Sequence, residues 1–136
     1  RSGPRADSET AGGRAEEVIV ADTSVWIDHF RRHNAAFAAR LDAGEIAIHE
    51  SVIGELACGG LRHRAHVLQL LRSLFTVTSA SFDEVMHLID RRKLMGRGIG
   101  WTDAQILAGC MLGQARLWTL DVRLARIAEF LGVGVA

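Results

Sequence analysis

The chain has no apolar run long enough to cross a bilayer, which takes about 20 residues. Its first sixteen residues contain the only proline and no apolar residue larger than alanine, so we expect a flexible N-terminal tail over 1–16 and no signal peptide. One folded domain over 17–136 and a cytoplasmic location are the default expectations. The two cysteines, Cys58 and Cys110, lack metal-ligand spacing, and their apolar surroundings predict buried, reduced thiols.

Lysine is also scarce, since Lys93 is the only one among sixteen basic residues and the rest are arginine. Sixteen acidic residues balance them, so the formal net charge is zero. This balance does not indicate a nucleic-acid-binding protein, and any such surface would depend on local clustering. Arginine suits bidentate contacts with phosphate, but the codon bias of a GC-rich genome explains its abundance equally well.

Short strand-like segments alternate with amphipathic helical segments along the chain. Strands are predicted at 17–22, 45–50, 75–79 and 115–121, and helices at 25–44, 51–60, 61–74, 81–96, 102–113 and 122–133. Ser81 and Glu84 have the spacing of a capping box, and Thr102 is a candidate cap for the helix that follows it. The alternation predicts an α/β domain with a mostly parallel sheet. The last residues could add a short edge strand.

Three acidic residues fall where such a sheet places functional sites. Asp22 and Asp121 end predicted strands, and Asp103 opens a predicted helix. Each alone is most simply a helix cap or a first-turn acid. Together they belong to the carboxyl-end edge of a parallel sheet, where ligands bind. Glu55 is the fourth candidate, because it lies in a mostly apolar helical segment and its carboxylate is expected to point into the site.

Four carboxylates close together raise one another's pKa unless a cation compensates their charge. Oxygen ligands without histidine or cysteine suit Mg²⁺ or Mn²⁺ rather than Zn²⁺. A divalent cation held in this way can polarise a phosphoryl oxygen, so the acidic set points to phosphodiester hydrolysis.

Four segments in this order resemble the PIN-domain ribonucleases and, among them, the VapC toxins of bacterial toxin–antitoxin pairs. The segments are VIVADTSVWIDHFR, SVIGELACGG, GIGWTDAQILAGC and LWTLDVRLARIAEFLGV, and the resemblance extends over 18–135. It implies a PIN-like three-layer α/β/α domain with a central, mostly parallel sheet. It also implies a Mg²⁺-dependent (or Mn²⁺-dependent) endoribonuclease that acts as the toxin of a VapBC-type pair and inhibits growth or translation.

The resemblance also implies a role for each acidic residue. Asp22 and Asp103 would be the main metal ligands, while Glu55 and Asp121 would complete the metal shell, mostly through waters. Thr119 would support the site with its hydroxyl group, and Thr23 or Ser24 would do likewise, although helix capping alone also explains those two residues. The implied partners are a second copy of the chain and a cognate VapB-type antitoxin that inserts into or beside the acidic site. DNA binding is expected only indirectly, through that antitoxin.

Arg97 and Arg123 adjoin the acidic motifs, so they are the first candidates for contact with RNA phosphates, although a solvated surface explains them about as well. Among the tryptophans, Trp101 is the one to test for substrate contact because it precedes Asp103.

Two other classes of protein remain as alternatives. A phosphorylated receiver domain also carries acids at strand ends, but it needs a lysine after a late strand, and Lys93 lies in a predicted helix. A catalytically silent PIN-like protein- or RNA-interaction module is the main alternative. The complete set of four acids argues against it.

Overall fold

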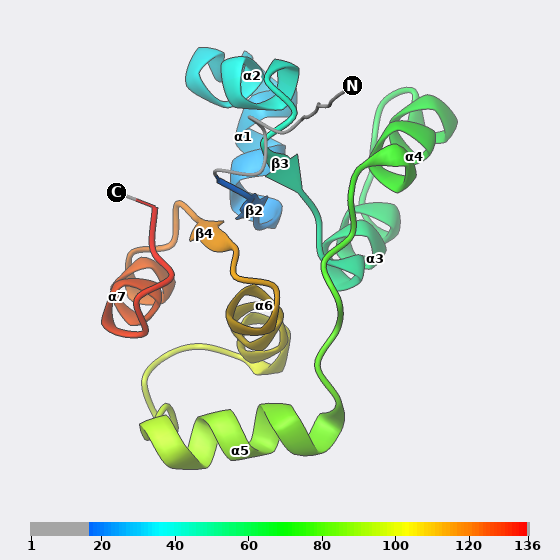
Figure 1. The fold of residues 1–136 in the computed structure, drawn as a ribbon. Coiled ribbons are helices and arrows are strands. Elements are labelled where there is room, and N and C mark those ends of the chain that lie inside the picture. Colours follow the sequence, from blue (N-terminus) through cyan, green and yellow to red (C-terminus); the bar gives the residue numbers. More distant parts are fainter. Residues whose placement is uncertain (1–16, 136) are drawn as a thin grey trace, which may run out of the picture.

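A computed structural model describes residues 17–135, and the predicted tail over 1–16 lies outside the described residues. The centre of the domain is a parallel sheet in the order β3-β2-β4, formed by β2 (Ile19–Ala21), β3 (Ile46–Ala47) and β4 (Arg116–Trp118) (Figure 1). Ile19 pairs with Ile46 on one side and with Arg116 on the other. The β2 residues are fully buried, as expected of a β-branched central strand.

Two predicted outer strands are reduced to single parallel bridges. Ile48 pairs with Thr76 where the strand at 75–79 was expected, and Leu117 pairs with Gly134 where the C-terminal edge strand was expected. Both segments therefore lie in their predicted places. The prediction of a full strand at 75–79 was wrong because only Val77 of this segment is buried, which leaves little apolar surface to hold a longer ladder.

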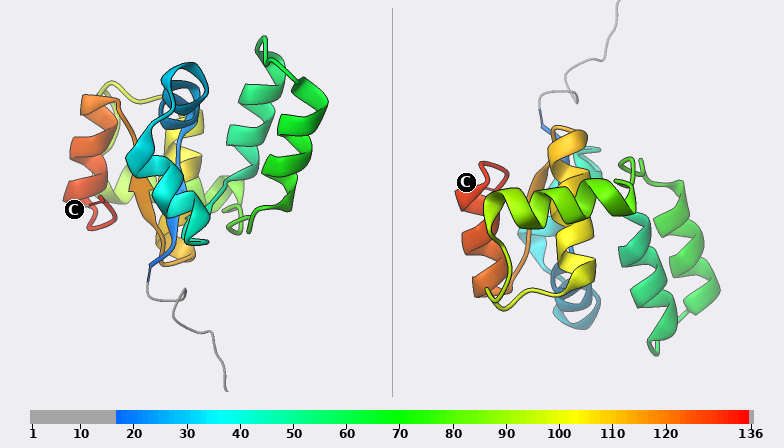
Figure 2. Two further views of the ribbon diagram at one scale, coloured as in Figure 1. Left: turned by 90° about the horizontal axis from the view of Figure 1, so that it is seen from above. Right: turned by 90° about the horizontal axis from the view of Figure 1, so that it is seen from below.

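Seven helices cover the sheet within residues 17–135. They are α1 (Thr23–Arg32), α2 (Ala35–Asp42), α3 (Glu50–Cys58), α4 (Arg64–Ser73), α5 (Phe82–Arg92), α6 (Trp101–Leu112) and α7 (Val122–Phe130). Helices α1 and α2 lie on one face and α6 on the other, with α5 laid across the outside of α6 (Figures 1 and 2). Helix α7 packs beside β4, and the α3–α4 pair stands on the opposite side. This arrangement confirms the predicted three-layer α/β/α fold.

The core joins the sheet to its helices through large apolar side chains. Trp26 meets Phe37 edge-on with ring centroids 4.7 Å apart, and Phe37 in turn contacts Trp118 at 5.7 Å. Cys110 is buried as predicted, and burial raises the pKa of its thiol to about 12, which keeps it protonated and inert. The prediction of burial was wrong for Cys58, which is exposed at the last residue of α3. No helix within 17–135 has both the length and the apolar character needed to cross a membrane.

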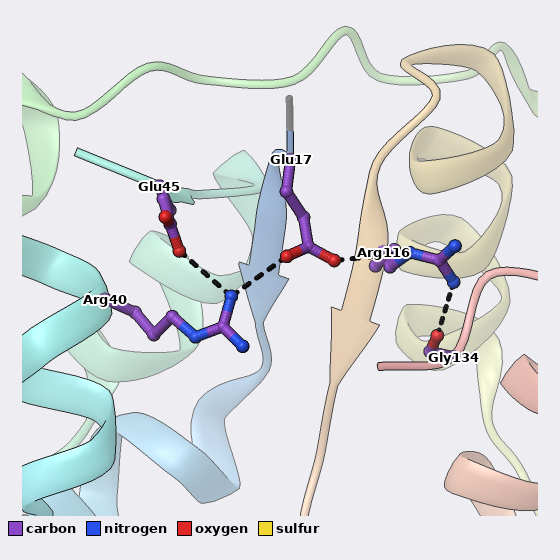
Figure 3. A network of polar contacts seen from close by, with 5 residues as sticks. All are labelled: Glu17, Arg40, Glu45, Arg116 and Gly134. Carbon is purple, nitrogen blue, oxygen red and sulfur yellow. Dashed lines mark hydrogen bonds and ion pairs between the residues drawn. The ribbon is translucent and has the colours of Figure 1, made fainter. Parts of the chain in front are cut away.

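A network of ion pairs ties together the start of the sheet (Figure 3). Glu17 precedes β2 and contacts Arg40 of α2 at 2.9 Å and Arg116 of β4 at 3.4 Å. Arg40 also contacts Glu45, and Arg116 donates a hydrogen bond to the carbonyl of Gly134. These side chains are partly exposed, so solvent screening leaves each pair only a small contribution to stability. The network lies at the edge where β2 begins, and the predicted acidic site lies where β2 ends.

Candidate active site at the strand ends

Asp22 follows β2 directly and is one of the buried polar residues, with 6% of its surface exposed. Its side chain caps α1. The Oδ1 atom accepts hydrogen bonds from the Ser24 amide (3.1 Å), the Ser24 hydroxyl (2.5 Å) and the Val25 amide (3.4 Å). The Oδ2 atom accepts a short hydrogen bond from the Thr119 hydroxyl. These donors and the positive end of the α1 dipole stabilise a carboxylate that would otherwise be costly to bury.

Thr119 connects the ends of β2 and β4. While its Oγ1 donates to Asp22, the same oxygen accepts a hydrogen bond from the Asp121 amide at 3.0 Å. Ser24 adds a second link, because its Oγ accepts a hydrogen bond from the Leu120 amide at 2.9 Å. The two strand-to-helix junctions are therefore held in register by hydroxyl groups.

Asp121 caps α7 in the same way that Asp22 caps α1. Its Oδ1 accepts hydrogen bonds from the amides of Arg123 (2.9 Å) and Leu124 (3.2 Å), and the residue is exposed. Its two carboxylate oxygens are thus only partly used by the cap. Asp121 therefore has the helix-capping role that is ordinary for an acid at this position. This role is compatible with metal binding, because the capping hydrogen bonds use only Oδ1.

Asp103 lies in the first turn of α6 and accepts a hydrogen bond from the Gly100 amide at 3.3 Å. The helix begins at Trp101 with Gly100 as its N-cap, so the prediction of Thr102 as the cap was wrong. Burial raises the pKa of the Asp103 carboxyl, and the charges of Asp22 and Asp121 raise it further, while the Gly100 amide acts in the opposite direction. Asp103 therefore lies within the electrostatic reach of the other two predicted acids, Asp22 and Asp121.

Glu55 comes from another helix, α3. It is exposed on α3 and lines a groove of about 630 Å³ that also includes Ile27 and Phe30 of α1. Glu55 is not among the charges that shift the pKa of Asp103. Within residues 17–135, no three acidic, histidine or cysteine side chains are close enough together to hold one metal ion directly.

The two predicted phosphate-binding arginines lie at the loop before α6 and at the start of α7. The guanidinium carbon of Arg97 stands 5.4 Å from the centre of the Phe130 ring, and that of Arg92 stands 5.5 Å from it. The side chain of Arg123 lies across Gly98, where a β-carbon would come within 2.6 Å of its Cδ atom. Glycine, whose φ here is +86°, lets Arg123 lie against the loop that precedes Asp103.

Of the two predicted alternatives, Thr23 and Ser24, the hydroxyl that reaches Asp22 belongs to Ser24. The signal was available in the spacing, because an N-cap side chain accepts from the second or third helical residue. Thr23 is the first helical residue. Among the described residues, the hydrogen bonds to the Asp22 carboxylate come from Ser24, Val25 and Thr119.

The fold and this edge define an α/β domain with carboxylates gathered where its parallel strands end. The sequence profile of the PIN domain matches residues 19–130, and the chain belongs to the PIN-domain family. It is 42% identical over 120 residues to "Ribonuclease VapC32" of Mycobacterium tuberculosis, in both strain CDC 1551 / Oshkosh and strain H37Rv, covering 88% of this chain and 97% of the relative. Among solved structures, the crystal structure of PAE2754 from Pyrobaculum aerophilum is similar, with a TM-score of 0.62, 18% identity, and coverage of 90% of this chain and 91% of that one. At 18% identity, the similarity to PAE2754 concerns the fold alone.

Proposed function

We propose that this chain is a metal-dependent endoribonuclease and the toxin component of a VapBC-type toxin–antitoxin pair. Membership of the PIN-domain family and the 42% identity to a ribonuclease over nearly the whole of that relative support hydrolysis of RNA. The observation that carries the proposal is the gathering of Asp22 and Asp121 at the ends of the paired strands β2 and β4, where the Thr119 hydroxyl donates to the Asp22 carboxylate and accepts from the Asp121 amide. The raised pKa of Asp103, which burial and the charges of Asp22 and Asp121 cause together, supports it. A set of carboxylates under mutual repulsion is a natural site for a cation.

The donor set fits a divalent cation such as Mg²⁺ or Mn²⁺. All the candidate ligands are carboxylate oxygens, which suit Mg²⁺, and Mg²⁺ commonly retains several waters in its shell. Asp22 and Asp103 would be the main ligands, and Glu55 and Asp121 would complete the shell through waters. When bound, the cation would offset the negative charge of the site and polarise a phosphoryl oxygen of the substrate.

The remaining residues position these groups. Thr119 and Ser24 fix the Asp22 carboxylate, which leaves part of Oδ2 available to face the site. Thr23 stays a weaker supporting candidate. Arg97 and Arg123, which adjoin the acidic motifs in the sequence, would contact phosphates next to the bond that is cut.

The decisive test is cleavage of RNA by purified protein with Mg²⁺ or Mn²⁺, compared with Asp22→Asn and Asp103→Asn. Asparagine keeps the shape and the oxygen acceptor of each side chain but removes the charge, so the helix caps are retained. Asp42→Asn is the matched control, because Asp42 is exposed at the C-terminal end of α2. We expect both site variants to lose cleavage and the control to keep it. Full activity in Asp22→Asn and Asp103→Asn would contradict the proposal and favour the silent interaction module.

We also propose a cognate VapB-type antitoxin that inserts into or beside the acidic site, with a homodimer as the active assembly and the cytoplasm as its location. The groove beside Glu55 supports the first point, because Ile27 and Phe30 leave more than a third of their surface exposed there. An apolar antitoxin segment would cover these side chains, and an arginine on it would reach the acids. Any contact with DNA would then occur through the antitoxin.

A further inference from the structure

Two aromatic side chains from different helices form an exposed pair beside the acidic edge. Phe82 is the first residue of α5 and Trp101 the first residue of α6, and their ring centroids lie 5.3 Å apart with an interplanar angle of 42°. The exposed fractions are 66% for Phe82 and 41% for Trp101. Each ring therefore contacts the other on one side and keeps much of its surface open to solvent.

This exposure contrasts with the other aromatic cluster of the domain. Trp26 and Phe37 also contact each other, but both are fully buried, so their apolar area contributes to folding. The pair formed by Phe82 and Trp101 leaves much of its apolar area exposed to solvent. An aromatic contact by itself contributes little beyond area burial. Burial in the core therefore does not explain why large rings stand here.

The pair lies at the same end of α6 as the acidic site. Trp101 and Asp103 are two residues apart in the first helical turn, and at about 100° per residue they leave the helix on nearly opposite sides. Asp103 lies on the side of Asp22 and Asp121, whose charges raise its pKa, while Trp101 lies on the side of α5, where it contacts Phe82. The start of α6 thus separates the carboxylates from the aromatic rings by about one helix width.

We propose that Phe82 and Trp101 form a stacking platform for one unpaired base of the RNA substrate. The platform would hold a nucleotide neighbouring the one whose phosphate is cut. An RNA strand that crosses the start of α6 would present its phosphate to the acids on one side and a base to the rings on the other. Single-stranded RNA is commonly held by aromatic stacking of splayed-out bases. A base in a duplex already has both faces covered. The platform therefore selects unpaired RNA, and it rests on the proposed ribonuclease function.

Tryptophan fluorescence tests the platform without requiring catalysis. The purified full chain is titrated in EDTA with a short single-stranded oligoribonucleotide, and with the same strand annealed to its complement. Intact oligonucleotide is verified on a gel after each titration. Trp26 is fully buried and Trp118 half-buried, so the difference between wild type and Trp101→Phe isolates the signal of Trp101.

We expect the single strand to quench Trp101 and the duplex to leave its fluorescence almost unchanged. Trp101→Ala should raise the dissociation constant of the single strand about five-fold or more, the lower end of the effect of losing one stacked base. Trp101→Phe should stay close to wild type, because it keeps an aromatic face. Phe75→Ala is the matched control, since Phe75 is 65% exposed but lies outside the pair.

Unchanged Trp101 fluorescence, or equal binding by wild type and Trp101→Ala, would overturn the platform. Equal quenching by single strand and duplex would overturn the selection of unpaired bases. RNA cleavage in Mg²⁺ is measured separately on the same protein. Cleavage without quenching would reject the platform and leave the ribonuclease in place, whereas quenching without cleavage would do the reverse.

Discussion

Replacing Thr119 with valine removes one hydroxyl that serves two acids while keeping the shape of the side chain. The Oγ1 atom donates to the buried carboxylate of Asp22 and accepts from the Asp121 amide. A hydrogen bond to a charged group contributes about 1.5–3 kcal/mol. The Asp121 amide lies at an exposed residue, where water can replace its partner. We therefore expect Thr119→Val to lower the free energy of unfolding by about 2 kcal/mol, dominated by the loss at Asp22.

Urea unfolding measures this loss directly, and the slope of the unfolding free energy against urea should stay unchanged. The melting temperature should fall by roughly 8 °C, at about 4 °C per kcal/mol for a domain of this size. RNA cleavage should drop about 10- to 100-fold, as is usual when a group that orients a metal ligand is removed. Thr119→Ser should restore both properties because it keeps the hydroxyl. Thr78→Val is the control, since Thr78 is exposed in the segment 75–79, which pairs with Ile48 through a single bridge. Wild-type stability and activity in Thr119→Val would refute this reasoning.

Three further predictions concern charge and the groove. Asp103→Asn should stabilise the metal-free protein above the ordinary carboxyl pKa of 3.8, because burial and two like charges raise the pKa of Asp103 and so oppose its ionisation in the folded state. Thermal unfolding should also show a smaller gain from Mg²⁺ in this variant. Burial lowers the pKa of His49 in the folded state, so the unfolded state binds the proton of this histidine more readily. The free energy of unfolding should therefore fall as the pH drops from 6.5 through the lower pKa of the folded state. Phe30→Asp, in the groove beside Glu55, should weaken co-purification with the antitoxin while RNA cleavage persists.

Each of these predictions has an outcome that would contradict it. If Asp103 mattered mainly as a first-turn acid of α6, Asp103→Asn would be less stable than wild type. For the pH dependence, His49→Asn should flatten the slope between pH 5 and 7, a window set by the ordinary histidine pKa, and His66→Asn, at an exposed position of α4, should not. An unchanged slope in His49→Asn would assign the effect to another group. Undiminished capture of the antitoxin by Phe30→Asp would place its binding surface elsewhere.

Local sequence determined the elements that create the acidic edge. The β-branched run before Asp22 and the apolar strand before Asp121 have short-range patterns, and both acids cap the helices that follow, as their positions indicate. The capping box of Ser81 and Glu84 is present as predicted. These features depend on neighbours within a few residues, and the capping hydrogen bonds likewise join residues two or three positions apart. Alternation of strands and helices then limited the fold to a parallel α/β arrangement.

Local sequence patterns could not predict contacts between segments that lie far apart along the chain. Ser24 and Thr119 are far apart along the chain, yet both donate to Asp22. Cys58 is exposed because its helix ends at the surface, although its flanking residues are apolar. The contact between Phe82 and Trp101 depends on how α5 crosses α6, which no spacing encodes.

The chain by itself determined which acids stand at the ends of strands and the starts of helices, because caps and strand periodicity are local properties. Only the tertiary structure decided which of those acids lie close enough for the charge of one to shift the pKa of another. It brought Asp22, Asp103 and Asp121 into one electrostatic field and placed Glu55 in a separate groove. The physical reason is that burial and distance between charges set the pKa of a carboxyl, and both are properties of packing between segments rather than of the segments themselves.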